Sequence, residues 1–408
     1  MNQSSHLILD ILRAGLNGSP LPRDPGLDQD SWKALLQISE EQGILPLVYE
    51  TVCRCQSFRT LEKDVRTSFQ SRALHAVSRQ ITQTNEFLTL LLHAQAAGLD
   101  PIVLKGIIVR ELYPAPMLRP SVDEDVLISA DEAETYHRFL LSEGLYADDP
   151  GTNFDVIRER SYHKKDSPTY IELHADFFPP DSEAYADCNT LFDEALGRTI
   201  TVQIEDVSVR TLAPTDHLLY LICHAYKHFL YSGIGIRQIC DIGMFSRVYG
   251  REVDWNHIWE ACQRIHIGYF TAAIFRITHR YLGFDMPEVF SDIEVAESDL
   301  LEDTFAGGMY GAHDIDRLHS STMTLDAVAS DRAGKRRGGV LRSVFPPAEK
   351  LQGRFPYLRR YPVLLPVAWG QRIWGYLSRK NSPATHPTRS IEIGNRRIEL
   401  LKEYGIIE

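Results

Sequence analysis

The sequence contains no long hydrophobic run. No stretch approaches the roughly 18 consecutive apolar residues that a membrane-spanning helix needs, so we expect no transmembrane segment. Residues 1–15 also lack the basic start and the long apolar stretch of a secretory signal. Cysteines are sparse, six in 408 residues, and none of them forms a CxxC pair. These absences predict a cytoplasmic protein whose thiols stay reduced.

Three widespread active-site motifs are missing as well. The chain has no GxSxG, no GxxxxGK[ST] and no GxGxxG. The first motif exposes a nucleophilic serine, and the other two hold phosphate groups against backbone N–H groups. Serine-hydrolase, P-loop NTPase and Rossmann-dehydrogenase functions therefore have no support.

Basic residues are outnumbered by acidic ones. The chain has 43 Lys+Arg against 55 Asp+Glu, a net charge of −12, and broad nucleic-acid binding needs a basic surface. Nucleic acid is therefore an unlikely general partner. Residues 331–380 are the exception, with twelve basic residues and two acidic ones. We expect this segment to pack on the acidic body as a clamp; contact with an anionic surface or a polynucleotide is the alternative.

Hydrophobic periodicity predicts an α+β protein, in which a small mixed β-sheet core is flanked by an N-terminal and a C-terminal helical region. The predicted segments are a helical region at 1–98, the core at 99–211, a helical domain at 212–330 and a basic, aromatic- and proline-rich segment at 331–408. We expect three helices over 214–283 and leave 391–407 as helix or strand.

A long helix is predicted near residues 60–97, ending at Gly98. Its predicted apolar face consists of Leu74, Val77, Ile81, Leu88 and Leu91, which recur at helical spacing.

Short apolar or alternating runs follow and predict strands. The expected strands are 102–104, 125–129, 154–164 and 169–177, with a hairpin over 198–211. A helix is expected at 131–144.

Two aspartates stand two residues apart where strand 125–129 begins. Because side chains alternate along a strand, Asp123 and Asp125 share a face. Two carboxylates at such a short distance repel each other unless a cation lies between them. Mg²⁺ is the usual cation, with Mn²⁺ as its substitute. Glu172, on the polar face of strand 169–177, would complete a two-metal site for phosphoryl-type transfer. The alternative is a solvated strand end.

The short motifs around these acids follow a recognisable order. They are Leu104-Lys105-Gly106, Tyr113-Pro114, Arg119, Asp123-Glu124-Asp125 and Glu172-Leu173-His174. In this order they resemble the uncharacterised bacterial nucleotidyltransferase family of the DNA-polymerase-β-like nucleotidyltransferase superfamily. The resemblance extends over most of the chain, through the helices that carry His224, His228 and Asp241.

The resemblance implies a nucleotidyltransferase core at 99–211 that moves a nucleoside monophosphate from an NTP to a hydroxyl acceptor, with Mg²⁺ or Mn²⁺ as cofactor. Asp123, Asp125 and Glu172 would hold the metals and carry the chemistry. The implied nucleotide contacts are Lys105, Gly106, Arg119 and His174. A solvent-directed lysine and a surface arginine are the alternatives for Lys105 and Arg119.

Two departures from the superfamily pattern stand out. Where superfamily members carry Gly-Ser after the first strand, this chain has Lys105-Gly106, so the nucleotide must be held differently. Val122 and Glu124 also replace the usual glycine and apolar residue around the first aspartate.

Other polar pairs have simpler interpretations. His224 and His228 share a helix face, but the HExxH glutamate is absent, so we expect them to pack in the core or line a cleft rather than bind zinc. Asp241 follows Arg237 by four residues, which predicts a helix-surface pair. The acceptor, a small molecule or a protein, stays open. A catalytically silent nucleotide-binding or scaffold protein and a polynucleotide-directed transferase are the competing functions.

Overall fold

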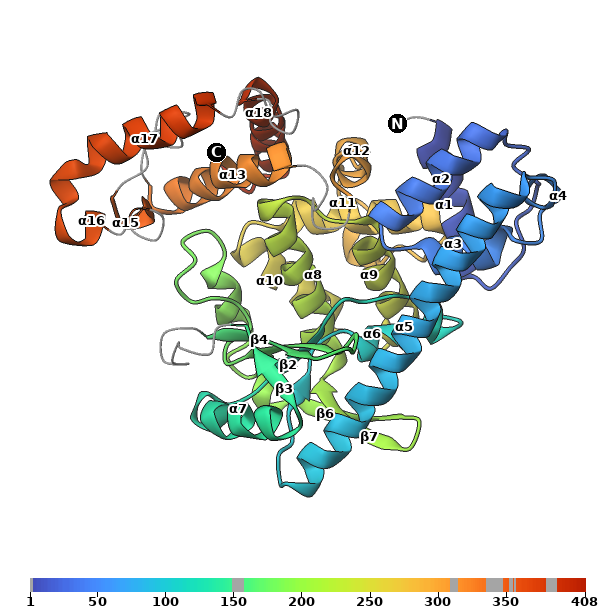
Figure 1. Cartoon of the computed structure of the whole chain (residues 1–408), viewed down its shortest axis with the longest axis horizontal. Helices are drawn as coiled ribbons and strands as arrows, with labels where there is room; N and C mark the ends of the chain where they lie inside the picture. The colour runs from blue at the N-terminus through green and yellow to red at the C-terminus, as the bar shows by residue number, and fades with distance from the viewer. Residues whose placement is uncertain are drawn as a thin grey trace.

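The computed structural model describes residues 3–148, 158–308, 315–334, 348–351, 355, 357–378 and 387–408. A five-stranded sheet and a two-stranded hairpin lie at one end of the molecule, and most of the helices gather at the other (Figure 1). This arrangement confirms the predicted α+β class, with helices at both ends of the chain. Within the described ranges, none of the helices combines the length and the hydrophobicity that a membrane crossing requires.

The larger sheet has the strand order β1-β2-β5-β4-β3. Its strands are β1 (Ile102–Val103), β2 (Glu124–Leu127), β3 (Leu145–Ala147), β4 (Glu159–Lys164) and β5 (Tyr170–His174). The predicted strands at 102–104, 125–129 and 169–177 are confirmed, and β4 confirms the second part of 154–164; residues 154–157 lie outside the described residues. The hairpin of β6 (Thr199–Ile204) and β7 (Val207–Leu212) is confirmed too.

One parallel pairing determines how the acids meet. β2 and β5 run parallel, and the register places Asp125 opposite Glu172, whereas the other pairs in this sheet are antiparallel. Asp123 precedes β2 directly. Neighbouring strands lie about 4.8 Å apart, so this register brings the two carboxylates to the same edge and face of the sheet.

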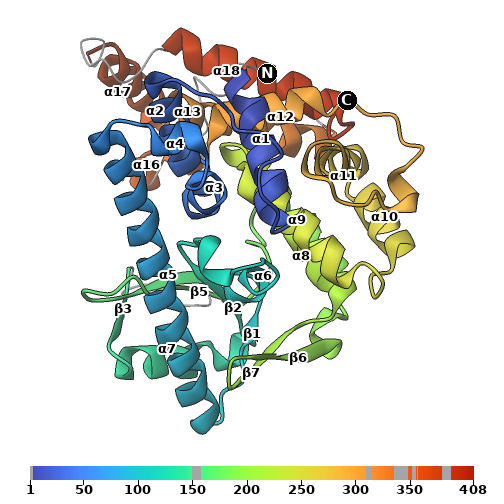
Figure 2. The same cartoon turned by 90° about the vertical axis from the view of Figure 1, so that its right-hand side faces the viewer.

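The N-terminal part is helical, as predicted. It comprises α1 (Gln3–Leu16), α2 (Gln29–Glu41), α3 (Leu45–Val52), α4 (Gln56–Arg59) and α5 (Lys63–Ala96). Asp28 caps α2 by accepting a hydrogen bond from the Ser31 backbone N–H. Figures 1 and 2 show α5 running from the bundle of α1–α4 past the sheet, so this helix links the two ends of the molecule.

The predicted apolar face of α5 is wrong in its first half. Leu74 and Ile81 are 53% and 42% exposed, whereas Leu88 and Leu91 are buried. The reason is that α5 packs against different neighbours along its length. Phe69 joins the core of the N-terminal helices, and Leu88 joins the core beneath the sheet, so no single stripe is buried throughout.

Helices also cover the region after β7. They are α8 (Pro214–Tyr231), α9 (Ile236–Tyr249), α10 (Trp255–Arg264), α11 (Gly268–Leu282), α12 (Ser298–Gly307), α13 (Ile315–Arg332) and α18 (Pro387–Glu403). The predicted three helices over 214–283 are four in the structure, because the chain turns at His266, whose φ is 61°, and separates α10 from α11. Residues 391–407, left as helix or strand, are largely helical in α18.

The helices before and after the sheet share one hydrophobic core. Ile8 of α1 and Phe275 of α11 belong to the same buried cluster, as does Tyr404 beyond α18. The short α6 (Ile107–Arg110) and α7 (Ala133–Ser142) lie beside the sheet. Asp131, predicted near the start of the latter helix, gives it no side-chain cap.

The basic C-terminal segment is described only in part. Its described elements are α15 (Ala348–Leu351), α16 (Tyr357–Arg360) and α17 (Leu365–Ser378), with a small apolar cluster around Leu358. Arg332, at the end of α13, forms an ion pair with Asp187. Much of the predicted basic cluster, including residues 335–347 and 379–380, lies outside the described residues. The clamp therefore stays a prediction.

Candidate active site

Two aspartates and a lysine meet where β2 begins. Lys105 Nζ lies 2.8 Å from Asp125 Oδ2 and 3.3 Å from Asp123 Oδ2. The three side chains are almost fully buried, with Lys105 only 5% exposed. The predicted common face of the two aspartates agrees with this geometry, and the lysine supplies the cation that neighbouring carboxylates require.

Glu172 and His174 approach the same carboxylates from β5. His174 Nε2 lies 3.3 Å from Asp125 Oδ1 and 3.8 Å from Glu172 Oε2. Its other ring nitrogen, Nδ1, is 3.5 Å from Glu159 Oε2 on β4. The histidine is therefore held between acids of three adjacent strands, a position that alternation along β5 places on the face of Glu172.

Glu124 points away from this face into the core. Its carboxylate forms an ion pair with Arg110 and accepts a hydrogen bond of 2.7 Å from the Ile107 backbone N–H. A Cβ on Gly106 would lie 2.0 Å from Glu124 Oε2, and the φ of Gly106 is +69°. Glycine is therefore required at 106 by both contact and conformation. The acidic residue between the two aspartates is a structural ion-pair partner.

Arg119 is buried beneath the site and paired with Asp241 of α9. Its Nε and Nη2 donate hydrogen bonds of 2.9 and 2.6 Å to the two carboxylate oxygens. Tyr113 donates a third hydrogen bond to Asp241, at 2.7 Å. The surface alternative for Arg119 is wrong, and the predicted surface position of Asp241 and Arg237 is wrong too, because both side chains are buried. Sequence spacing did not reveal that Arg119 is a partner of Asp241 on a distant element.

His224 and His228 of α8 close the site on the side of Lys105. His224 Nε2 lies 3.2 Å from Lys105 Nζ and 3.2 Å from His228 Nε2. Burial, reinforced by the positive charge of Lys105, lowers the pKa of both histidines well below the ordinary value. His224 is thus neutral and accepts a hydrogen bond from the lysine, which agrees with the expected cleft-lining role.

The acids of the site differ in their affinity for protons. Burial opposes ionisation of Asp125, but Lys105 and His174 outweigh it and hold the pKa of Asp125 below its usual range. Burial, together with the charges of Asp125 and Asp123, raises the pKa of Glu172 to about 7. One carboxylate is therefore fixed as an anion while the other exchanges protons near neutral pH, the division expected of a charge stabiliser and a general base.

The donor set suits a divalent cation. Ligand atoms of Asp125, Glu172 and His174 all lie within 4.8 Å of one another. Asp123 Oδ1 is buried and has no hydrogen-bond partner among the described residues. Carboxylate oxygens are the ligands that Mg²⁺ and Mn²⁺ prefer. The geometric cluster includes His174 rather than Asp123, so the acids named from the sequence lie close together but form no symmetrical triad.

Several participants escaped sequence reasoning. Glu159 of β4 and Lys227 of α8 lie 3.5 Å apart at the edge of the site, and neither belongs to a recognisable motif. Alternation along β4 was the one sequence signal that could have identified Glu159 as a residue of the site. In the structure, the register of β4 and β5 places Glu159 opposite His174. No sequence pattern indicated that Asp241 is the partner of Arg119.

Comparison with known proteins adds one finding. A family model described as uncharacterised nucleotidyltransferase matches residues 28–283, from the N-terminal helices through the sheet to α11. No curated protein and no solved structure matches the chain.

Proposed function

The chain belongs to the uncharacterised nucleotidyltransferase family, and from this premise we propose that it transfers a nucleoside monophosphate from an NTP to a hydroxyl group of an acceptor. In this reaction the acceptor oxygen attacks the α-phosphorus. The bond between that phosphorus and the bridging oxygen breaks, and pyrophosphate leaves with the electron pair. The site must therefore remove one proton and stabilise charge on two oxygens.

Glu172 is our candidate for the general base. Without a bound cation its pKa is about 7, which leaves a substantial fraction ionised at neutral pH to accept the proton of the attacking hydroxyl. A bound divalent ion would lower this pKa and increase the ionised fraction. His174, between Asp125 and Glu159, orients the carboxylates of the strand edge. Asp123 and Asp125 provide fixed negative charge, and together with Glu172 they would hold Mg²⁺ or Mn²⁺. A bound divalent ion would neutralise phosphate charge and polarise the phosphoryl group.

Lys105 would bind phosphate once the aspartates are neutralised. Its ammonium group is already buried beside them, and a compact cation suits a non-bridging phosphate oxygen. Gly106, lacking a Cβ, allows the turn after Lys105 to pack closely against Glu124, and we assign it to positioning Lys105 beside the aspartates. Arg119 donates two hydrogen bonds to the Asp241 carboxylate and a longer one, of 3.5 Å, to the Gly106 carbonyl oxygen, so we assign it to holding the turn after β1 in position.

The observation that carries the proposal is the register of β2 and β5. It places Glu172 opposite Asp125 on parallel strands, two positions after Asp123, within the segment that matches the family. One contact favours a second candidate, a catalytically silent nucleotide-binding protein. Lys105 lies between the aspartates, where it neutralises both without any metal.

Label transfer distinguishes the two candidates. The protein is incubated with each [α-³²P]NTP and Mg²⁺, once with a deproteinised low-mass cell extract and once with the protein fraction of the same extract, so that small-molecule and protein acceptors are separated. We expect a labelled product whose formation slows by at least about a hundredfold in Glu172→Gln. Glu134→Gln, an exposed glutamate on α7, is the matched control. Binding of NTP without labelled product in either incubation would favour the silent protein.

A further inference from the structure

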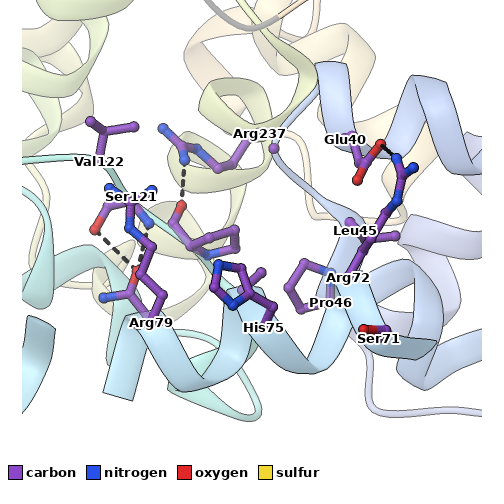
Figure 3. A pocket seen from close by; sticks show the side chains of 14 residues that line it. Glu40, Leu45, Pro46, Ser71, Arg72, His75, Arg79, Ser121, Val122 and Arg237 are labelled. Carbon is purple, nitrogen blue, oxygen red and sulfur yellow. Dashed lines mark hydrogen bonds and ion pairs between the residues drawn. The ribbon is translucent and has the colours of Figure 1, made fainter. Parts of the chain in front are cut away.

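A cavity lies beside the start of β2, on the side of the N-terminal helices. Its volume is about 440 Å³, within the range of small-molecule sites. α5 forms one wall, the segment before Asp123 forms another, and α9 contributes Arg237 (Figure 3). None of the carboxylates of the candidate site lines this cavity, but Val122, the residue before Asp123, does.

The cavity wall is positively charged. Figure 3 shows His75 and Arg79 rising from α5 toward Ser121 and Val122, with Arg237 across the cavity. The acidic Glu40 is neutralised by Arg72, whose Nη1 lies 2.7 Å from it. Neither His75 nor Arg79 has a hydrogen-bond or ion-pair partner among the described residues. The guanidinium group of Arg79 therefore forms no ion pair with a carboxylate of the described residues and can bind an anionic ligand.

A buried amide supports a ligand in this position. Gln80 lines the cavity and is only 1% exposed. Its Oε1 accepts a hydrogen bond of 2.6 Å from the Ser121 backbone N–H, whereas its Nε2 has no partner within the described residues. A buried donor left unpaired is destabilising, and a hydrogen bond from Gln80 Nε2 to a ligand oxygen would remove that penalty.

The cavity leads to the catalytic strands. Val122 lines it and is followed directly by Asp123. A second cavity of about 840 Å³ shares His75, Arg79 and Val122 and extends to Tyr170, two residues before Glu172. In this second cavity the negative charge of Asp166 offsets the positive charge of Lys164, so the net positive charge of the lining lies at Arg79. The two cavities share His75, Arg79 and Val122, so they form one groove along α5 whose lining includes Val122, the residue before Asp123, and Tyr170 of β5.

We propose that this groove binds the acceptor, and that the acceptor is a small phosphomonoester with a free hydroxyl group. This inference rests on the proposed nucleotidyl transfer. The triphosphate of the NTP must lie against Lys105 and the carboxylates, so the second substrate has to enter from an adjoining space. Arg79 and Gln80 bind the phosphate of the acceptor, and its hydroxyl end extends past Val122 toward Glu172, to which it gives its proton.

Calorimetric titration with D-glucose 6-phosphate tests the groove, with glucose and inorganic phosphate as separate probes. Wild-type protein should bind glucose 6-phosphate, and Arg79→Gln should weaken that binding at least about tenfold, because a charge-assisted hydrogen bond is lost. Arg138→Gln, at an exposed arginine of α7, is the matched control and should leave the affinity unchanged. Binding of phosphate alone at equal affinity, with the same loss in Arg79→Gln, would mark an anion site and overturn the acceptor assignment.

Lys105→Gln separates the groove from the nucleotide site. If the probe binds beside the carboxylates, Lys105→Gln abolishes its binding and Arg79→Gln does not, which overturns the proposal. Absence of any binding to wild type overturns it as well. These outcomes are independent of label transfer: failure of transfer with intact binding of glucose 6-phosphate refutes the proposed reaction, whereas transfer without a contribution of Arg79 refutes the groove.

Discussion

Lys105 Nζ lies 2.8 Å from Asp125 Oδ2, so the described site contains its own counter-ion. The lysine follows β1, the aspartate belongs to β2, and both side chains are buried. A metal ion that binds these acids has to compete with this ammonium group. Whether a metal ion can displace Lys105 from these aspartates therefore distinguishes an active enzyme from a catalytically silent protein.

Replacing Lys105 with glutamine should strengthen metal binding and weaken catalysis. Without the competing ammonium group, the affinity for Mn²⁺ in the absence of nucleotide should rise by about tenfold, which corresponds to about 1.4 kcal/mol of binding free energy. Nucleotide transfer should fall because the phosphate contact is lost. Calorimetric titration with Mn²⁺ measures the first effect, with exposed Lys33→Gln as the control. Equal Mn²⁺ affinity in both proteins would show that the lysine does not compete with the metal.

Gly106→Ala should be far more destabilising than Gly98→Ala. Both glycines have positive φ, +69° and +77°, so both substitutions carry a backbone cost of about 1–2 kcal/mol. Only at 106 does the new Cβ also collide with Glu124, and we expect a total cost of about 3 kcal/mol or more. Urea unfolding measures the difference. Equal losses in the two variants would mean that Glu124 moves aside freely.

The ion pair of Arg119 and Asp241 should show strong coupling. Removing either partner leaves a buried charge uncompensated, which costs about 3–5 kcal/mol. The double variant Arg119→Gln/Asp241→Asn should therefore lose much less than the sum of the two single variants. Unfolding free energies of the four proteins give the coupling. Additive losses would indicate that each residue is stabilised by its other contacts and not by this pair.

His217 should make the protein less stable in mild acid. Burial lowers the pKa of His217 from 6.5 to about 4 in the folded protein. Between these values the unfolded chain binds the proton and the folded chain does not, so stability falls as pH falls from about 6.5 to about 4, by at most about 3 kcal/mol from this group. Above pH 6.5 this contribution is complete.

His217→Asn isolates that contribution. Asparagine preserves a nitrogen near the position of Nδ1, which lies 3.2 Å from Thr211 Oγ1, but it does not titrate. Its unfolding free energy should depend less on pH across this window, while exposed His6→Asn should follow wild type. An unchanged slope in His217→Asn would place the acid sensitivity elsewhere.

Local patterns were sufficient to predict the described strands except β3, and the shared face of the acids. Alternation along a strand placed Asp123 with Asp125 and Glu172 with His174, because both relations need only the period of two. The pattern could not predict α5 correctly, since Leu74 and Leu88 meet different neighbours on one helix. Burial depends on what lies opposite a residue, and a helix that links two cores has more than one inward face.

Long-range partners were the main gap. Arg119 and Asp241 are 122 residues apart, and no pattern in the sequence pairs them. The same holds for Lys105 and His224, which meet only after α8 packs beside the sheet. Motif order predicted the residues of the candidate site; their partners, and therefore their charge states, required the fold.

Metal-dependent NTP binding tests the central claim most directly. Calorimetric titrations with each NTP, with and without Mg²⁺, are performed on wild type, on Asp123→Asn/Asp125→Asn and on the control Asp131→Asn, an exposed aspartate of the same segment. The account predicts that at least one NTP binds wild type and the control only when Mg²⁺ is present, and that the double variant loses this dependence. Equal Mg²⁺-dependent binding by the double variant, or no NTP binding by wild type, would contradict it.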